Sequence, residues 1–340
     1  MNKTNLWSEP KKISKHDISF FQSLVRNNWP KNNHIFSKDK KIINFYYNFK
    51  NNKKTNILGL YKKSKLVSAM GLIPNQNWDS KLKDDYFIAF LVKSKKLLSD
   101  STFIFLSFVY KKIKPKFLAV CGINLNTSGK IFQRLGKIEL FSHYYISNPN
   151  LKPKISKNLI SYKKKIFIDT PLELSLKINN KLNKLPISTH CPIKSKKFFQ
   201  KKYLEKPFYN YFIMNFYCAN KLIFFFICRK IEIKKYNTKI VRVIDFQGII
   251  PNKGSLANVL TKYLIKNNIE YIDMLCHGFS KDILENIGFL KKKNNQIIPD
   301  HFEPFTGKDA QLNFSILINK YKRNMILFKG DGDQDRPNII

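Results

Sequence analysis

The apolar positions of the chain follow two different spacings. In residues 14–27 and 38–49 they recur every three or four residues, which predicts two helices that each bury one face. Residues 56–61 and 65–72 are shorter apolar runs separated by a polar turn, which predicts a β-hairpin. We expect a strand, a helix, a strand and a short helix to follow, over residues 86–92, 99–112, 117–121 and 128–135. Gly136 comes directly after the last of these helices, where it suits a left-handed cap.

A similar order of elements recurs in the second part of the chain. We expect a helix, three strands, a helix, a strand and a helix, over residues 195–204, 209–217, 222–233, 240–246, 255–265, 270–275 and 281–286. Two last apolar segments, residues 312–318 and 325–328, can add antiparallel strands. The repeat is one of element order and not of residue identity. It predicts an α/β chain with two similar halves.

The stretch between the two halves differs in composition. Residues 148–165 are rich in Lys, Asn, Pro and Ser, which is typical of a linker or a seam between domains. We therefore expect three consecutive parts: an N-terminal domain over residues 1–150, a linker over 151–194 and a C-terminal domain over 195–340.

The strong positive charge does not by itself indicate nucleic-acid recognition. The 340 residues carry a formal net charge of +39, but only 6 of the 62 basic residues are Arg and 56 are Lys. Proteins that read DNA bases favour Arg, because its planar fork matches guanine and phosphate with two hydrogen bonds. We expect lysine-rich solvated faces with non-specific affinity for anionic lipid or RNA, and no specific DNA partner.

Cysteine usage and hydropathy further restrict the class of protein and the compartment in which it is expected. The 5 cysteines show no CxxC spacing, so neither a disulfide framework nor a metal cluster is expected, and a reducing compartment fits best. The first 15 residues contain no apolar core of a secretory signal. No apolar stretch approaches the roughly 20 residues of a membrane-spanning helix. We expect a cytoplasmic protein without a transmembrane segment.

The order of elements and several short motifs resemble the GNAT acyltransferase superfamily. The motifs are the hairpin residues 57–61 and 66–71, the Gly-Ile-Asn of residues 122–124 and the segment 131–136, with a similar pattern at residues 243–248 and 284–289. The closing segment 328–338 resembles the end of GNAT-like proteins encoded among bacterial surface-polysaccharide genes. Tandem halves of this kind are also similar to the FemABX aminoacyl transferases.

The resemblance implies a fold and an activity. The implied fold has two GNAT-like halves, each a mixed twisted β-sheet flanked by α-helices. The implied enzyme is an N-acyltransferase that transfers an acyl group from acetyl-CoA or another acyl-CoA to an amino sugar or sugar nucleotide in surface-polysaccharide biosynthesis. Two alternatives stay open: a FemABX-like aminoacyl transferase that uses charged tRNA, and an inactive GNAT-like scaffold that binds a partner.

The resemblance also implies where the donor binds. In the superfamily, the loop after the third strand presents backbone N–H groups to the pyrophosphate. The matching residues here are Val92, Lys93, Ser94, Lys95, Lys96 and, from the next motif, Asn124. This loop has no glycine, so its Cβ atoms crowd the backbone approach that glycine permits. The second half offers a more flexible alternative with Gly254 and Ser255.

The acid and base of such a transfer are less clear from the motifs. The superfamily's acid is often a Tyr four residues before the closing glycine, where this chain has Phe132 and Leu284. Asp245 ends an apolar strand. It is either a base whose pKa burial raises, or a structural carboxylate that pairs with Arg242 or caps the next loop.

Further polar residues gather near the end of the chain. Asp273 alternates like Asp245 on the neighbouring strand, and the two are expected to line one crevice with His277 at its rim. His301 and Glu303 point to one side of an extended segment and form a candidate base pair or a substrate-binding edge, unless Phe302 and its neighbours simply plug the core.

The closing segment adds acids to a basic chain. Asp331, Asp333 and Arg336 are expected either to fold back on a lysine-rich face or to form a polar wall of the acceptor site, with Arg336 binding a phosphate or carboxylate. A calcium loop is excluded, because its sixth position is Arg336 instead of Gly.

Overall fold

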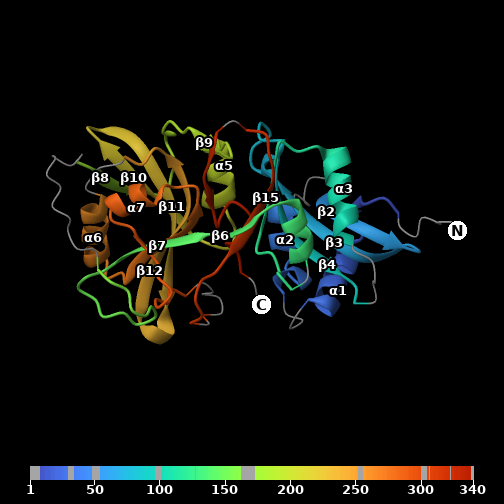
Figure 1. Cartoon of the computed structure of the whole chain (residues 1–340), viewed down its shortest axis with the longest axis horizontal. Helices are drawn as coiled ribbons and strands as arrows, with labels where there is room; N and C mark the ends of the chain where they lie inside the picture. The colour runs from blue at the N-terminus through green and yellow to red at the C-terminus, as the bar shows by residue number, and fades with distance from the viewer. Residues whose placement is uncertain are drawn as a thin grey trace. The chain divides into compact units, whose positions relative to one another are not determined.

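The chain forms two compact units. The computed structural model describes residues 8–29, 34–47, 54–95, 101–126, 128–161, 173–251, 256–299, 305, 307–321 and 323–337 (Figure 1). The first unit consists of Met1–Glu139, Asn313–Tyr321 and Gly332–Ile340, and the second of Leu140–Leu312 and Lys322–Asp331. Each unit is built on a mixed β-sheet with flanking helices, which confirms the predicted α/β class.

The units do not follow the three consecutive parts expected from the sequence. The first ends at Glu139 instead of residue 150, because strand β7 (Ser142–Ser147) pairs with β13 (Tyr271–His277) of the second unit. The stretch expected as a linker belongs to the second unit as well. Conversely, β15 (Asn313–Asn319) returns to the first unit, where it pairs with β5 (Phe117–Cys121).

The first unit contains a seven-stranded sheet. Its strand order is β1 (Lys11–Ser14), β2 (Lys54–Lys62), β3 (Lys65–Pro74), β4 (Asp85–Lys93), β5, β15 and β6 (Ile138–Leu140). Its helices are α1 (Ile18–Asn28), α2 (Lys40–Tyr47), α3 (Ser101–Phe108) and α4 (Gly129–Leu135), with short helical turns η1 (Ile35–Ser37), η2 (Asn75–Asn77) and η3 (Val109–Ile113). The predicted hairpin is β2–β3, whose turn places Lys63 and Ser64 at positive φ of 46° and 62°.

The second unit contains an eight-stranded sheet. Its main order is β14 (Leu290–Lys291), β7, β13, β12 (Thr238–Gly248), β11 (Lys221–Ile233), β10 (Tyr211–Cys218) and β8 (Ser175–Asn179), and β17 (Leu327–Phe328) also pairs with β13. The pair β9 (His190–Cys191) and β16 (Asn324–Met325) lies apart from it. The helices are α5 (Lys196–Phe199), η4 (Gln200–Leu204), η5 (Lys234–Tyr236), α6 (Leu256–Lys266) and α7 (Lys281–Asn286).

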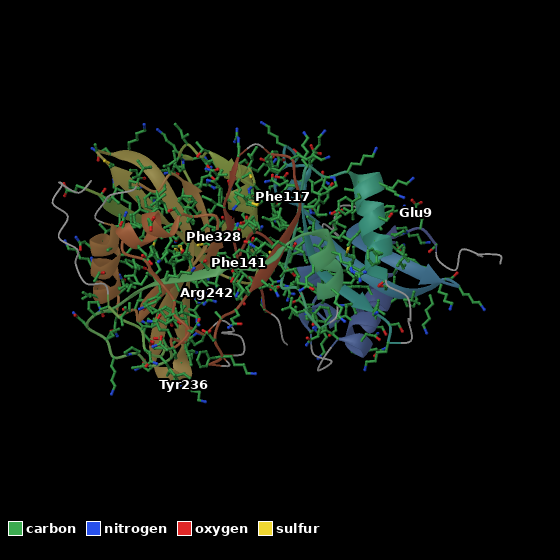
Figure 2. The ribbon with its side chains drawn as sticks, viewed as in Figure 1. Glu9, Phe117, Phe141, Tyr236, Arg242 and Phe328 are labelled. Carbon is green, nitrogen blue, oxygen red and sulfur yellow. The ribbon has the colours of Figure 1, made fainter. Side chains whose placement is uncertain are left out.

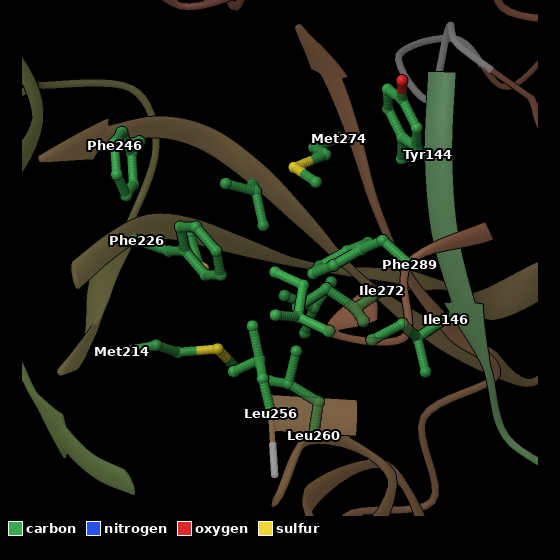
Figure 3. Packing of buried hydrophobic residues seen from close by; sticks show 14 of the residues in the cluster. Tyr144, Ile146, Met214, Phe226, Phe246, Leu256, Leu260, Ile272, Met274 and Phe289 are labelled. Carbon is green, nitrogen blue, oxygen red and sulfur yellow. The ribbon is translucent and has the colours of Figure 1, made fainter. Parts of the chain in front are cut away.

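Each sheet has its own hydrophobic core. In the second unit, Leu256 and Leu260 of α6 pack against Phe226, Ile272 and neighbouring strand residues (Figure 3). In the first unit, strand residues such as Ile88 pack against residues of α3 and α4. Nitrogen-tipped side chains project outward around both units, as solvated lysines do (Figure 2).

The predicted cap at Gly136 is wrong in its conformation. This residue has φ −174° and ψ 166°, which is extended backbone and not the left-handed cap. Its lack of a side chain serves a close approach instead. A Cβ there would lie 3.0 Å from the carbonyl oxygen of Ile316 and 3.1 Å from Ser315 Oγ, both on β15.

Candidate functional site

An opening in the first sheet lies where β4 parts from β5. The two strands pair in parallel only over residues 85–88 of β4, although β4 continues to Lys93 beside β3. In the β3 register, Phe90 lies opposite Gly71 and Ile88 opposite Leu72, so Ala89 is the extra residue of a β-bulge. Beyond the bulge, in the described part of this unit, residues 89–93 have β3 as their only ladder partner.

The bulge also redirects the side chains of β4. Ile88 packs into the core beneath α3 and α4. Two residues later, Phe90 contacts the rings of Phe21, Phe36 and Tyr47, with centroid distances of 5.4, 5.4 and 5.6 Å. Without the extra residue at Ala89, strand alternation would have placed Ile88 and Phe90 on one face.

The second sheet has the same feature at the corresponding place. Strand β12 pairs in parallel with β13 only over residues 241–243, although it continues to Gly248. In the β11 register, Asp245 lies opposite Ile227 and Val243 opposite Cys228, so Ile244 is the extra residue of the bulge. Each unit thus has a strand that bulges where its parallel neighbour leaves it.

In the second unit, the chain itself fills this opening. Strand β17 pairs with the end of β13, and the amide of Lys329 donates to the carbonyl of Leu275 at 3.2 Å. The next amide, of Gly330, donates across the opening to the carbonyl of Ile244 at 3.2 Å. A Cβ on Gly330 would lie 2.4 Å from Ile244 Cγ2 and 2.6 Å from its carbonyl oxygen, so only glycine fits.

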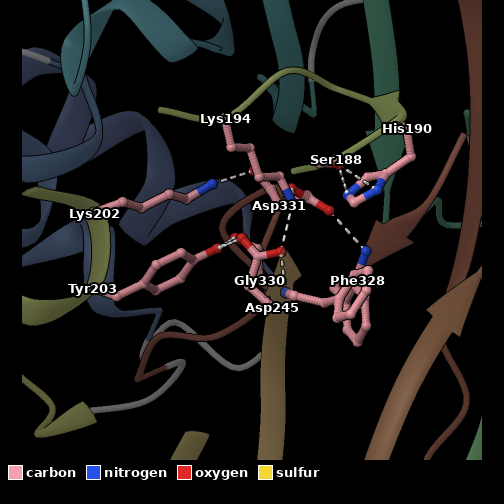
Figure 4. A network of polar contacts seen from close by, with 10 residues as sticks. Ser188, His190, Lys194, Lys202, Tyr203, Asp245, Phe328, Gly330 and Asp331 are labelled. Carbon is pink, nitrogen blue, oxygen red and sulfur yellow. Dashed lines mark hydrogen bonds and ion pairs between the residues drawn. The ribbon is translucent and has the colours of Figure 1, made fainter. Parts of the chain in front are cut away.

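A buried ionic network holds the inserted segment in place (Figure 4). Lys194 Nζ lies 2.5 Å from Asp245 Oδ1 and 2.6 Å from Asp331 Oδ1. Tyr203 donates its hydroxyl proton to Asp245 Oδ2 at 2.8 Å. Lys202 Nζ donates to the carbonyl oxygen of Asp331 at 2.5 Å, and the amide of Phe328 donates to Asp331 Oδ2 at 2.7 Å. The network therefore joins β12 to the closing segment of the chain.

The charges of this network depend on one another. Burial lowers the pKa of Lys194, but the nearby carboxylates of Asp245 and Asp331 overcome that effect, so its pKa is raised and the ammonium stays charged. Burial raises the pKa of Asp245, and Lys194 opposes that rise. His190 lies beside this cluster, where burial and the positive charge of Lys194 lower its pKa to about 4.

The structure does not bring Asp245 and Asp273 into one polar cluster. Arg242 lies directly opposite Asp273 in the parallel register and contacts it at 2.6 and 3.1 Å. Of the alternatives for Asp245, the pairing with Arg242 is therefore wrong. His143 Nε2 completes this second cluster, 2.7 Å from Asp273 Oδ2. His277 is partly exposed at the end of β13, opposite Leu327.

Asp245 has the contacts of an ion-pair residue. Its side chain is fully buried, and both of its oxygens accept hydrogen bonds. Its role as a base stays a prediction. The same holds for His301 and Glu303, which lie outside the described residues, as do Lys96, Gly254 and Ser255.

The remaining predicted donor residues lie at the carboxyl ends of β4 and β5. Val92 is buried, whereas Lys93 and Lys95 are exposed and Ser94 is half-buried. The amide of Lys95 donates to Asn28 Oδ1 at 2.9 Å, which ties the end of β4 to α1. Asn124 is exposed, and its side chain and carbonyl accept hydrogen bonds from the amides of residues 126 and 129, so it shapes the turn before α4.

The last residues of the closing segment belong to the first unit. Arg336 is buried, donates through Nε to Asp333 Oδ2 at 2.8 Å and stacks on the ring of Phe36 at 4.4 Å. Burial and the charge of Arg336 lower the pKa of His34 to about 3. Arg336 thus has a carboxylate partner within the chain, and Asp333 is engaged by it.

Sequence reasoning missed the basic partners of these acids. Lys194 and Lys202 are two of 56 lysines, and nothing in their local sequence marks them as buried. In the described part of the chain, no group of three or more His, Cys, Asp or Glu residues is placed to hold a metal ion. The described helices include none that is both long and apolar enough to span a membrane.

Comparison with known proteins finds likeness among solved structures alone. No protein-family profile and no curated protein sequence matches the chain. A GCN5-related N-acetyltransferase from Anabaena variabilis aligns at a TM-score of 0.49 and 9% identity, covering 91% of this chain and 72% of that one. An Enterococcus faecalis protein described as "Probable N-Acyltransferase" aligns at 0.49 and 10%, covering 90% and 72%.

A third alignment involves a eukaryotic enzyme. The N-myristoyltransferase of Saccharomyces cerevisiae, solved with bound myristoyl-CoA, aligns at a TM-score of 0.46 and 14% identity, covering 99% of this chain and 85% of that one. GNAT-type enzymes, which the sequence motifs resemble, are thus also found among the similar solved structures.

Proposed function

We propose that the chain is an acyl-CoA-dependent N-acyltransferase that binds its donor in the first unit. The observation that carries the proposal is the bulge at Ala89, beyond which residues 89–93 of β4 have no second ladder partner in the described structure. The pantetheine arm of an acyl-CoA contains amide groups, and an extended amide chain binds the free edge of a strand as an added strand does. The donor would pair with β4 beyond the point where β5 leaves it.

The second unit supports this use of the opening. Its corresponding opening holds an extended peptide, whose amides donate to the carbonyls of Ile244 and Leu275. An amide chain therefore fits an opening of this kind in this fold. The same occupancy argues against a second donor site there, so we favour the loop after β4 over the alternative with Gly254 and Ser255.

Lysine charge replaces glycine flexibility in the proposed pyrophosphate site. Lys93 and Lys95 are exposed at the end of β4, from which the chain leads to α3. An ammonium group attracts a phosphate at a range that does not require the backbone to approach it.

Tyr47 is the proposed acid for the departing thiolate. Its hydroxyl is buried and has no hydrogen-bond partner among the described residues. A Cβ on Gly71, opposite Phe90 beyond the bulge, would lie 2.7 Å from that hydroxyl. Burial raises the pKa of Tyr47 well above its usual value and the charge of Asp333 adds to this, so the hydroxyl keeps its proton at neutral pH.

The proposed reaction joins an amine to the acyl group. The amine nitrogen attacks the thioester carbonyl and gives up one proton to water, and the C–S bond breaks. The departing thiolate takes the proton that Tyr47 donates, and the Tyr47 phenolate then regains a proton from water. An amino group on a sugar or sugar nucleotide is the acceptor we propose, on the resemblance of the closing segment to proteins encoded among surface-polysaccharide genes.

Calorimetric titration with acetyl-CoA and free CoA tests the donor site. We expect binding at both 100 and 300 mM NaCl, and at least a tenfold loss of affinity in the double variant Lys93→Gln with Lys95→Gln. The matched control removes two exposed lysines of the same unit, Lys111 and Lys130, and should bind like the wild type.

Three results would overturn the donor site in the first unit. Binding that disappears at 300 mM NaCl would mean attraction of phosphate by lysine charge alone. Equal losses in the test and control variants would mean the same. A site in the second unit would instead give firm binding that neither pair of substitutions changes.

A further inference from the structure

The narrow end of the opening in the first sheet lies beside Cys121. Ile88 and Val120 form the last pair of the parallel ladder, and Cys121 is the next residue of β5. The amide of Phe117 donates to the carbonyl of Asp84, which precedes β4, and the backbone groups of alternate strand residues point to the same side. The carbonyl of Cys121, four residues after Phe117, therefore points toward β4 and into the opening.

The closing segment of the chain lies at this narrow end. Gln334 Nε2 donates to the carbonyl of Cys121 at 3.4 Å. A Cβ on Gly122 would lie only 3.0 Å from the same nitrogen. Two residues before Gln334, a Cβ on Gly332 would be in ordinary contact with the ring of Phe87 at 3.9 Å and with Cys121 Sγ at 4.0 Å. The closing segment thus covers the place where β4 and β5 part.

The opposite face of the sheet is filled at the same place. Ile88 and Val120 belong to the hydrophobic core beneath α3 and α4, together with Ile123. Ala89, the extra residue of the bulge, is partly exposed and carries only a methyl group. The narrow end is therefore bounded by the last strand pair, by this core on one face and by the closing segment on the other.

We propose that the acyl group of the donor is short, of the size of an acetyl to a butyryl group, and that Gln334 sets this limit. The inference rests on the proposed donor site. Residues 89–93 span roughly 16 Å at about 3.3 Å per residue, which is close to the length of an extended pantetheine arm. An arm that pairs with them from the lysine end brings its sulfur to the narrow end, where the acyl group meets the closing segment.

Gln334 is the boundary that a substitution can move. Its side chain is partly exposed and belongs to neither strand of the opening, whereas Ile88 and Val120 hold the sheet together. Shortening Gln334 should therefore lengthen the space for the acyl group and leave β4 and β5 in place.

Calorimetric titration of the whole chain with acetyl-, butyryl-, hexanoyl- and octanoyl-CoA tests the limit without any substitution. Acetyl-CoA and butyryl-CoA should bind with similar affinity, and octanoyl-CoA at least tenfold more weakly. A site with room for the chain would instead bind each longer donor more tightly, because every buried methylene adds hydrophobic free energy. Equal or tighter binding of octanoyl-CoA would overturn the inference.

The variant Gln334→Ala tests the assigned residue. It should reduce the ratio between the affinities for acetyl-CoA and octanoyl-CoA to less than threefold. The matched control is Gln133→Ala, which shortens an exposed glutamine of α4 and should keep the ratio of the wild type. The same ratio in both variants would overturn the assignment to Gln334.

The titrations also separate this inference from the proposed function. The Lys93→Gln with Lys95→Gln variant should weaken the binding of all four donors alike and keep their ratio, because these lysines are expected to contact the pyrophosphate and not the acyl group. A chain that binds neither free CoA nor any acyl-CoA would overturn the donor site and this inference with it. Firm binding of all four donors without discrimination by size would overturn this inference alone.

Discussion

Ala89 and Ile244 have the same place in their two units, because each is the extra residue of a β-bulge at which a strand loses its parallel neighbour. The repeat of element order in the sequence thus extends to a repeat of backbone irregularity. A bulge interrupts the ladder and bends the strand, so it leaves an opening that another segment or a ligand can fill. One opening holds the chain's own segment, and the other is the proposed donor site.

A substitution at Gly330 tests whether the closing segment fills the opening in the second sheet. We expect Gly330→Ala to destabilise the protein by about 1–3 kcal/mol, because its methyl group would overlap Ile244. Gly332→Ala is the matched control, since a Cβ there makes only ordinary contacts of 3.9 and 4.0 Å. Urea unfolding of both variants checks the difference. Equal stabilities would mean that the closing segment does not sit in the opening.

A substitution at Lys194 tests how much the buried ionic network contributes to stability. Lys194→Met should destabilise the protein by about 3–5 kcal/mol, because it leaves the carboxylates of Asp245 and Asp331 buried without their cation. Adding Asp245→Asn should restore part of the loss, since the amide carries no charge. Thermal and urea unfolding of the single and double variants measure this coupling. A double variant as unstable as the sum of the two single variants would show that the pair is not coupled.

Local patterns predicted the elements well. The change from helical to alternating spacing located α1, the β2–β3 hairpin and β4 to within a few residues. The bulges did not follow from these patterns, because a bulge is a mismatch between two strands and each strand alone looks regular. Nor did the pairing of β15 with β5, which joins distant parts of the chain.

The candidate site was likewise predicted only as far as local sequence patterns allow. An acid within an apolar strand drew attention to Asp245 and Asp273, and both are fully buried. Their partners depend on tertiary structure: Arg242 faces Asp273 through the parallel register, while Lys194 reaches Asp245 from another segment. Lysine is so frequent in this chain that the sequence does not distinguish the few buried lysines from the many exposed ones.

His190 should make stability depend on pH. Burial and Lys194 lower its folded pKa from 6.5 to about 4, so the unfolded state binds the proton first as the pH falls. Stability therefore decreases from pH 6.5 toward pH 4, by about 3 kcal/mol for this residue. Asp85 acts in the opposite direction, because burial raises its folded pKa to about 6 and favours folding at low pH.

A variant isolates the contribution of His190 from that of Asp85. We compare His190→Asn with the wild type in urea at pH 7, 6, 5 and 4. The free energies of unfolding should converge as the pH falls, because only the wild type loses stability through this imidazole. Parallel curves would show that His190 is protonated equally in the folded and unfolded states.

Tyr47 tests the proposed chemistry. If its hydroxyl protonates the departing thiolate, Tyr47→Phe should lower kcat by about 10²-fold or more and leave the affinity for acetyl-CoA unchanged. Tyr46→Phe is the control, because it removes a hydroxyl from the preceding position of the same helix α2. Release of CoA, followed with a thiol reagent during incubation with amino sugars and their nucleotide derivatives, gives the rate.

The two readouts separate catalysis from folding. Calorimetry with acetyl-CoA shows whether Tyr47→Phe still forms the donor site, and urea unfolding shows whether the buried ring still packs against Phe36 and Phe90. The hydroxyl has no hydrogen-bond partner among the described residues, so removing it should not destabilise the fold. A folded variant that binds acetyl-CoA and transfers acyl groups at the wild-type rate would exclude Tyr47 as the acid. A slow variant with unchanged affinity and stability would support the assignment, because a purely structural role would alter stability or affinity as well.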